Sequence, residues 1–157
     1  IDYLLPGKRL YMFGTGTGLA PFMSIIRDPD TYEKFDEVVL VHGCRLVSEL
    51  AYRDYITREL REHEFLGEMV ASQLKYYPTV TREPFLTQGR IPDLIENGQM
   101  ARDLGVPPLN PQVDRVMLCG SPEMLKSIKH VLEARGFNEG NTTTPGDFVV
   151  ERAFVEQ

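Results

Sequence analysis

Short runs of β-branched and aliphatic residues recur along the chain and alternate with stretches in which apolar residues follow a helical spacing. Five runs are typical of strands: Arg9 to Phe13, Glu37 to His42, Lys75 to Val80, Arg115 to Cys119 and Asp147 to Arg152. Strands that alternate with helices usually pair in parallel, with helices on both faces of the sheet. The pattern therefore predicts an α/β fold with a doubly wound, mainly five-stranded parallel sheet.

One helix is predicted between the second and third strands. The segment from Ser48 to Glu62 brings four apolar residues to one helical face, and these are Leu50, Tyr55, Ile56 and Leu60. That face is expected to pack on the sheet.

A second helix is marked by its end signals rather than by its apolar spacing. Ser121 suits an N-cap, Pro122 suits the first turn, and Gly136 is placed to end the helix after Arg135. By contrast, residues 84–111 are rich in proline and glycine and have only short apolar groups, which predicts a loop with one or two brief helices.

Composition limits the classes of protein to which the chain can belong. Its 157 residues, 42% of them hydrophobic, suit one globular domain. A net charge of -6 opposes a broad basic surface for nucleic acid or an anionic membrane. The longest aliphatic run, Val38 to Val41, is far shorter than the roughly 20 residues of a membrane span. No nucleic-acid or membrane partner is expected.

The remaining general features point to a reducing compartment. Residues 1–8 have neither a basic start nor a long apolar core, so they do not resemble a secretory signal and look like a cut end. Cys44 and Cys119 form no C-x-x-C pair, and His42 and His130 have no ligand partner at metal spacing. We therefore expect a cytoplasmic protein without a metal site.

A glycine-rich turn follows the first predicted strand and leads into a helix that starts near Pro21. It reads Gly14-Thr15-Gly16-Thr17-Gly18-Leu19-Ala20-Pro21. Glycines let backbone N–H groups approach a phosphate, and a helix N-terminus favours negative charge. The turn departs from G-x-G-x-x-G because Leu19 stands where the third glycine would follow, and it lacks the Gly-Lys of a P-loop. The turn indicates pyrophosphate binding, with a simple connecting turn as the alternative.

The second strand ends without the acidic residue that usually holds the ribose hydroxyls of NAD. Basic and hydroxyl side chains follow the second and third strands instead, namely Arg45, Thr81, Arg82 and Arg90. One guanidinium group can bind two phosphate oxygens at once, so these residues favour the 2′-phosphate of NADP. The alternative is that these arginines are solvated or pair with neighbours such as Glu83.

The fourth strand ends in Cys119-Gly120-Ser121-Pro122, at the sheet edge where doubly wound folds bind their ligands. A lone cysteine in such a place is most often a small buried apolar residue.

These motifs occur in a fixed order along nearly the whole chain. They are the glycine turn, Val41-His42-Gly43, Tyr76-Tyr77-Pro78 with Val80-Thr81-Arg82-Glu83, the Cys-Gly-Ser-Pro turn, and the ending from Phe148 to Phe154. In this order the chain resembles the Rossmann-like NADP-binding domain of bacterial ferredoxin/flavodoxin–NADP reductases.

The resemblance implies a role for most of the motif residues. Residues 15–21 would cradle the pyrophosphate and the nicotinamide ribose, Cys119 would lie beside the nicotinamide, and Glu151 would lie near the flavin. Cys119 and Glu151 are therefore the predicted catalytic pair. Ala153 replaces the stacking aromatic of plant enzymes, and residues 154–157 would form a tail against the flavin. The predicted cofactor-binding residues are Gly14, Thr15, Gly16, Thr17, Gly18, Ala20, Pro21, His42, Gly43, Arg45, Thr81, Arg82, Arg90, Gly120, Ser121, Pro122, Ala153 and Phe154.

The resemblance also implies the rest of the enzyme. Residues 1–157 would be the NADP-binding domain of a monomeric reductase, whose FAD lies on a preceding β-barrel domain that this chain does not contain. FAD would exchange a hydride with NADP(H) and electrons with ferredoxin or flavodoxin, and the fragment alone would be inactive. Two alternatives remain, an NADH-dependent reductase of the same superfamily and a stand-alone nucleotide-binding module.

Overall fold

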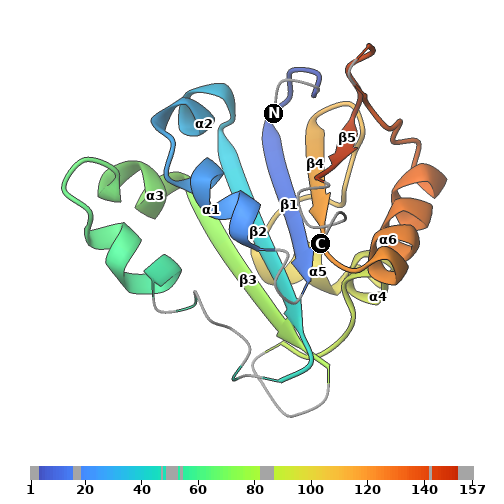
Figure 1. The fold of residues 1–157 in the computed structure, drawn as a ribbon, viewed down its shortest axis with the longest axis horizontal. Helices are drawn as coiled ribbons and strands as arrows, with labels where there is room; N and C mark the ends of the chain where they lie inside the picture. Colours follow the sequence, from blue (N-terminus) through green and yellow to red (C-terminus); the bar gives the residue numbers. More distant parts are fainter. Residues whose placement is uncertain are drawn as a thin grey trace.

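A parallel β-sheet forms the centre of the protein (Figure 1). The computed structural model describes residues 4–15, 19–46, 48, 53, 55–81, 87–141 and 143–151. Within them, the strands are β1 (Arg9–Thr15), β2 (Glu37–Cys44), β3 (Leu74–Val80), β4 (Asp114–Cys119) and β5 (Phe148–Val150). All pair in parallel in the order β3-β2-β1-β4-β5, which confirms the predicted fold class.

The strand order reverses next to β1. From β1 the chain moves outward through β2 to β3, then crosses back to β4 on the other side of β1 and ends at β5. The loops after β1 and β4 therefore leave the sheet in opposite directions. In doubly wound folds the ligand crevice lies outside the carboxyl ends of the strands at such a switch point.

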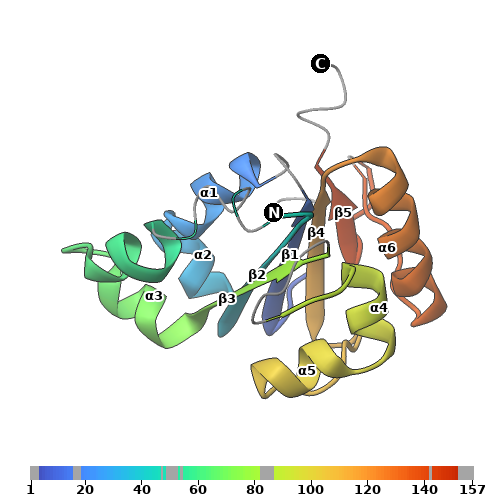
Figure 2. The same cartoon turned by 90° about the horizontal axis from the view of Figure 1, so that it is seen from below.

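Helices cover both faces of the sheet (Figure 2). One face carries α1 (Ala20–Ile26), α2 (Pro29–Lys34), a π-helical turn η2 (Tyr55–Glu59), a 3-10 turn η3 (Leu60–Glu62) and α3 (Gly67–Gln73). The other face carries α4 (Ile91–Glu96), α5 (Gln99–Leu104) and α6 (Pro122–Ala134).

The core is divided by the alternation of side chains along the strands. In β1, Leu10 and Met12 face the layer of α1 to α3, whereas Tyr11 and Phe13 face the layer of α4 to α6. β1 and β2 are buried almost throughout, because a parallel sheet is covered on both sides. This explains why their sequences read as nearly continuous apolar runs.

The segment predicted as a helix over residues 48–62 is helical where the structure describes it, but the helix is irregular. Residues 55–59 form a π-helical turn and residues 60–62 a 3-10 turn. The Thr57 hydroxyl donates to the carbonyl oxygen of Arg53 over 2.8 Å, a contact that competes with the regular backbone ladder. The apolar side chains Ile56 and Leu60 are nevertheless buried in the core, as their spacing predicts, whereas Leu50 lies outside the described residues.

Other predictions agree more closely with the structure. The Ser121 hydroxyl accepts from the Met124 amide over 3.4 Å, and Gly136, at a φ of 90°, follows the end of α6. The first helix begins at Ala20, and the segment predicted as loop holds α4 and α5. β5 ends at Val150. The predicted end of this strand, Arg152, lies outside the described residues. α2 and α3 were not predicted.

Candidate functional site

Three of the predicted motifs lie side by side at the carboxyl edge of the sheet. Gly14 of β1 is the register partner of His42 in β2 and of Cys119 in β4. One residue further on, Thr15 is the partner of Gly43. Parallel pairing alone brings these residues together, because each of the three strands ends at the same level.

The turn after β4 contacts the last residue of β1, Thr15. The Ser121 amide donates to the Thr15 hydroxyl over 3.3 Å. Gly120 has a φ of 146°, and a Cβ built on it would overlap Thr15 Oγ1. A side chain at Gly120 would therefore force this turn away from Thr15, so glycine is required here for both conformation and space.

The turns after β1 and β4 each lead into a helix. Pro21 lies in the first turn of α1 and Pro122 in the first turn of α6, where a missing N–H is tolerated. Ala20, Ser121 and Pro122 are exposed, and Pro21 is half-buried. The predicted residues Gly16, Thr17 and Gly18 lie outside the described part of the chain. The described flanks of the glycine turn thus lie at the switch point.

The predicted catalytic pair lies at the ends of β4 and β5. Cys119 is only 1% exposed, and the Glu151 amide donates to the Leu118 carbonyl oxygen over 2.7 Å. Burial raises the pKa of the Cys119 thiol, and the negative charge of Glu151 raises it further. The thiol is therefore protonated at neutral pH and acts as a small neutral group rather than as a thiolate nucleophile. Ala153 and Phe154 lie outside the described residues.

The described residues predicted to bind the 2′-phosphate, Arg45, Thr81 and Arg90, also lie at this edge. Arg45 follows β2 and is exposed, and the Thr81 amide donates to the Cys44 carbonyl oxygen over 3.0 Å. Arg90, also exposed, is the N-cap of α4. A Cβ on Gly43 would lie 3.1 Å from Ile91 Cδ1, so the start of α4 packs against the end of β2. Arg82 lies outside the described residues.

A short return of the chain, which sequence reasoning missed, brings Arg90 to the edge. Gln88 forms an isolated parallel bridge with Val80, and the Thr79 hydroxyl donates to the Gly89 carbonyl oxygen over 2.7 Å. One residue of the sequence could have indicated this return: Gly89, which follows Thr87 and Gln88, permits a tight turn immediately before a helix.

His42 reaches the edge with its backbone rather than with its imidazole. The ring is 1% exposed, and its Nε2 lies 3.3 Å from Cys44 Sγ inside the protein. Any contact of His42 with a coenzyme would therefore involve main-chain atoms.

The described residues show neither a metal site nor a membrane-spanning helix. They contain no group of three or more His, Cys, Asp or Glu side chains placed to hold a metal ion. No helix among them is long and apolar enough to cross a bilayer.

The parallel order, the switch point next to β1 and the paired turns define a doubly wound nucleotide-binding domain. Residues 12–130 match the family described as oxidoreductase NAD-binding domain, and the chain belongs to this family.

Within this family, the chain is similar to ferredoxin–NADP reductases. It is 55% identical over 157 residues to the enzyme of Pseudomonas aeruginosa, covering 99% of this chain and 61% of that one. It is 56% identical over 155 residues to the enzyme of Azotobacter vinelandii, covering 98% of this chain and 60% of that one. The chain thus spans about three fifths of the length of these relatives.

A solved structure of a similar protein covers nearly the whole fold. It is a ferredoxin NADP+ reductase from Neisseria gonorrhoeae with bound FAD and NADP, and it superimposes with a TM-score of 0.82 at 31% identity. The match covers 96% of this chain and 58% of that chain.

Proposed function

We propose that this chain binds NADP(H) and that residues 1–157 are the NADP-binding domain of a flavin-dependent ferredoxin–NADP or flavodoxin–NADP reductase. The observation that carries the proposal is the contact of the turn after β4, at Gly120, with Thr15 at the end of β1, beside the end of β2 and the start of α4. The 55% identity to a ferredoxin–NADP reductase along 99% of the chain supports it.

The chain has the groups that each part of NADP needs. The glycines of the glycine turn and Gly120 carry no side chain, so their backbone could approach the pyrophosphate closely. Arg45, Thr81 and Arg90 lie where the adenosine end would extend from the switch point, and Arg82 follows Thr81 in the sequence. Arginine suits a phosphate dianion because its planar donors bind two oxygens at once.

The proposed reaction assigns a part to Cys119 and Glu151. FAD, when bound, supplies the conversion between hydride transfer and single-electron transfer. Cys119 offers a small neutral thiol at the end of β4, which can border the nicotinamide without adding charge. Glu151, directly after β5, offers a carboxylate whose charge acts on Cys119. Both residues would position the reacting groups.

Further parts of the proposal concern the whole protein. The solved relative holds FAD as well as NADP, and the chain covers 58% of it. A preceding FAD-binding barrel domain, ferredoxin or flavodoxin as electron partner, a monomeric state and a cytoplasmic location complete the proposal. Cys44 and Cys119 are buried and form no disulfide with each other, which agrees with a reducing compartment.

The test is a comparison of two small ligands. Isothermal titration calorimetry of the protein with 2′-phospho-AMP and with AMP isolates the contribution of the 2′-phosphate. We expect 2′-phospho-AMP to bind at least about tenfold more tightly, since hydrogen bonds to charged groups contribute about 1.5 to 3 kcal/mol each. Equal affinity would favour the NADH-dependent alternative, and no binding of either ligand would overturn the proposal. A gene without a preceding barrel domain would favour the stand-alone module.

A further inference from the structure

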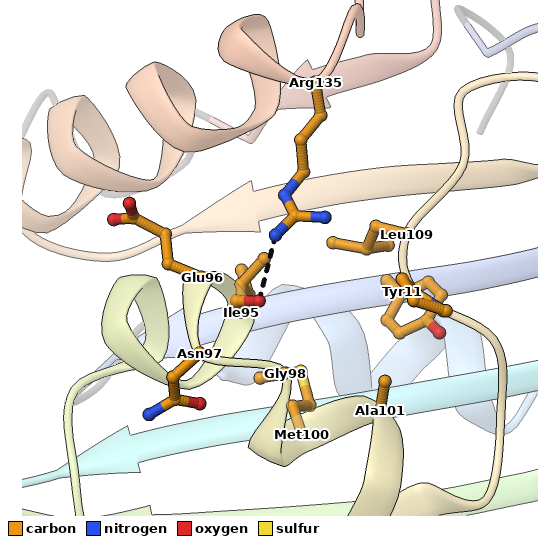
Figure 3. A pocket seen from close by; sticks show the side chains of 10 residues that line it. Tyr11, Ile95, Glu96, Asn97, Gly98, Met100, Ala101, Leu109 and Arg135 are labelled. Carbon is orange, nitrogen blue, oxygen red and sulfur yellow. Dashed lines mark hydrogen bonds between the residues drawn. The ribbon is translucent and has the colours of Figure 1, made fainter.

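A cavity of about 230 Å³ lies between β1 and the layer of α4 to α6 (Figure 3). The last turn of α4, the start of α5, the loop before β4 and the end of α6 enclose it. Its main lining residues are Tyr11, Ile95, Met100, Ala101, Leu109 and Arg135.

This cavity is separate from the candidate coenzyme edge. α4 begins at the edge, where Ile91 packs against Gly43, and its last residues Ile95 and Glu96 line the cavity. α6 begins beside Gly120, and Arg135 follows its far end. The 13 residues of α6 span about 20 Å at 1.5 Å per residue, so the two sites lie at opposite ends of the same helix.

The walls are mostly apolar and well buried. Tyr11, Ile95 and Met100 are 2%, 6% and 3% exposed. The Tyr11 hydroxyl takes part in none of the hydrogen bonds between described residues. Burial raises the pKa of Tyr11, so the hydroxyl stays protonated and keeps its proton for donation. The lining suits an apolar ligand with a polar group, to which Tyr11, Ile95 and Met100 each present only a small exposed edge.

Arg135 supplies a positive charge at the cavity. Its Nη2 donates to the Ile95 carbonyl oxygen over 3.1 Å, which fixes the guanidinium between α6 and α4 (Figure 3). Among the described residues, the Arg135 guanidinium makes this hydrogen bond and no ion pair. Four of its five N–H donors are thus available for an oxygen ligand. The side chain of Glu96 points away from the guanidinium in Figure 3.

We propose that this cavity binds a small aryl carboxylate, with its ring against the apolar lining and its carboxylate on Arg135. A carboxylate matches the guanidinium in charge and in geometry. The size of the cavity sets the size of the ligand, because drug-sized molecules occupy pockets of about 300 to 1,000 Å³. A cavity of about 230 Å³ suits a single-ring compound.

The first experiment titrates the protein with benzoate and with benzamide, its uncharged counterpart, by ligand-observed NMR and calorimetry. We expect benzoate to bind and benzamide to bind at least about tenfold more weakly, since charge-assisted hydrogen bonds are about twice as strong as neutral ones. Saturation with 2′-phospho-AMP should leave the benzoate Kd unchanged. Absent benzoate binding, equal affinity for both probes, or competition with 2′-phospho-AMP would overturn the proposal.

Variants then locate the binding to this cavity. Arg135→Gln should reduce benzoate affinity about tenfold, to the level of benzamide, and Ala101→Leu should fill the cavity and weaken both probes. Lys126→Gln removes an exposed positive charge elsewhere on α6 and should change neither affinity. If Arg135→Gln does not fold, Ala101→Leu decides the question. Unchanged benzoate binding in the folded variants would overturn the proposal, and 2′-phospho-AMP binding independently reports on the proposed function.

Discussion

At the scale of single residues, the candidate site depends on one close approach of the chain to itself. The turn after β4 contacts Thr15 at the end of β1 because Gly120 has no side chain and adopts a φ of 146°. The Thr15 hydroxyl occupies the space that a Cβ on Gly120 would fill, and it accepts a hydrogen bond from the Ser121 amide. One glycine thus determines both the conformation of its own turn and the distance of that turn from Thr15.

Gly120→Ala should lower the free energy of unfolding by about 1 to 3 kcal/mol, the range for a strained backbone position, and should weaken 2′-phospho-AMP binding. Gly105→Ala is a matched control, because Gly105 has a φ of 69° but nothing lies within 4 Å of a Cβ built there. It should cost less stability and leave nucleotide affinity intact. Chemical denaturation and calorimetry measure both effects, and equal losses in the two variants would remove the contact with Thr15 from the explanation.

The arginines provide the second prediction at this scale. Arg45→Ala and Arg90→Ala should each weaken 2′-phospho-AMP about ten- to a hundredfold and leave AMP nearly unchanged, because only the first ligand has the 2′-phosphate. Arg82→Ala tests the member of the set outside the described residues. Arg102→Ala, an exposed arginine of α5, is the control. Equal losses for both nucleotides would make Arg45 and Arg90 structural residues.

At the scale of elements, ion pairs join the strands at the amino end of the sheet, opposite the candidate site. Arg9 of β1 contacts Glu37 of β2 over 3.1 Å and Asp114 of β4 over 3.5 Å. Lys75 of β3 contacts Glu37 over 3.2 Å. Four neighbouring strands are therefore linked through charged side chains. Burial alone would raise the pKa of Glu37, but Lys75 and Arg9 together lower it.

Glu37→Gln should lower the free energy of unfolding by about 1 kcal/mol near neutral pH, because Glu37 is 25% exposed and has two cationic partners. A carboxylate with a lowered pKa stabilises the folded state above its unfolded pKa, and this stabilisation is lost as the pH falls through the folded pKa. The difference in unfolding free energy between wild type and variant should therefore shrink as the pH falls below about 4.3, the pKa of an unperturbed Glu, and vanish at more acidic pH. Glu139→Gln, which removes the more exposed pair with Lys129, is the control. A difference independent of pH in denaturant unfolding would contradict the prediction.

Local sequence signals identified the elements unequally. The strands were recognised because burial on both faces leaves a continuous apolar run, as in residues 38–41. α6 was recognised because its cap and its terminating glycine are local features. The irregular helical turns over residues 55–62 were predicted only as a helix, since apolar spacing reports which side chains are buried but not whether the backbone ladder is regular. The contact of Thr15 with Gly120 was not foreseen, because it depends on β1 and β4 being neighbours, which is a property of the whole sheet.

At the scale of the whole molecule, the parts of the candidate site come from segments far apart in the sequence and meet at one edge. The chain as a whole carries a net charge of -6, so its overall field does not attract a phosphate ligand. Attraction must come from local arginines and from the backbone of the turns. The proposed aryl-carboxylate cavity lies at the other end of α6, which leaves the carboxyl edge, with Cys119 and Glu151, for the proposed contact with the flavin.

The last prediction concerns the longer protein with FAD bound, in which Cys119 and Glu151 should affect hydride transfer rather than nucleotide affinity. Cys119→Ala and Glu151→Gln should each slow reduction of the flavin by NADPH about tenfold or more, since small displacements of reacting groups have large effects on rate. The NADPH Kd should change little, because the basic groups and the turns that hold the nucleotide remain. Stopped-flow absorbance gives both quantities. Cys44→Ala is the matched control, as Cys44 is also buried but ends β2 rather than β4. If Cys119→Ala and Glu151→Gln transfer hydride at the rate of the wild type and of Cys44→Ala, neither residue belongs to the catalytic site.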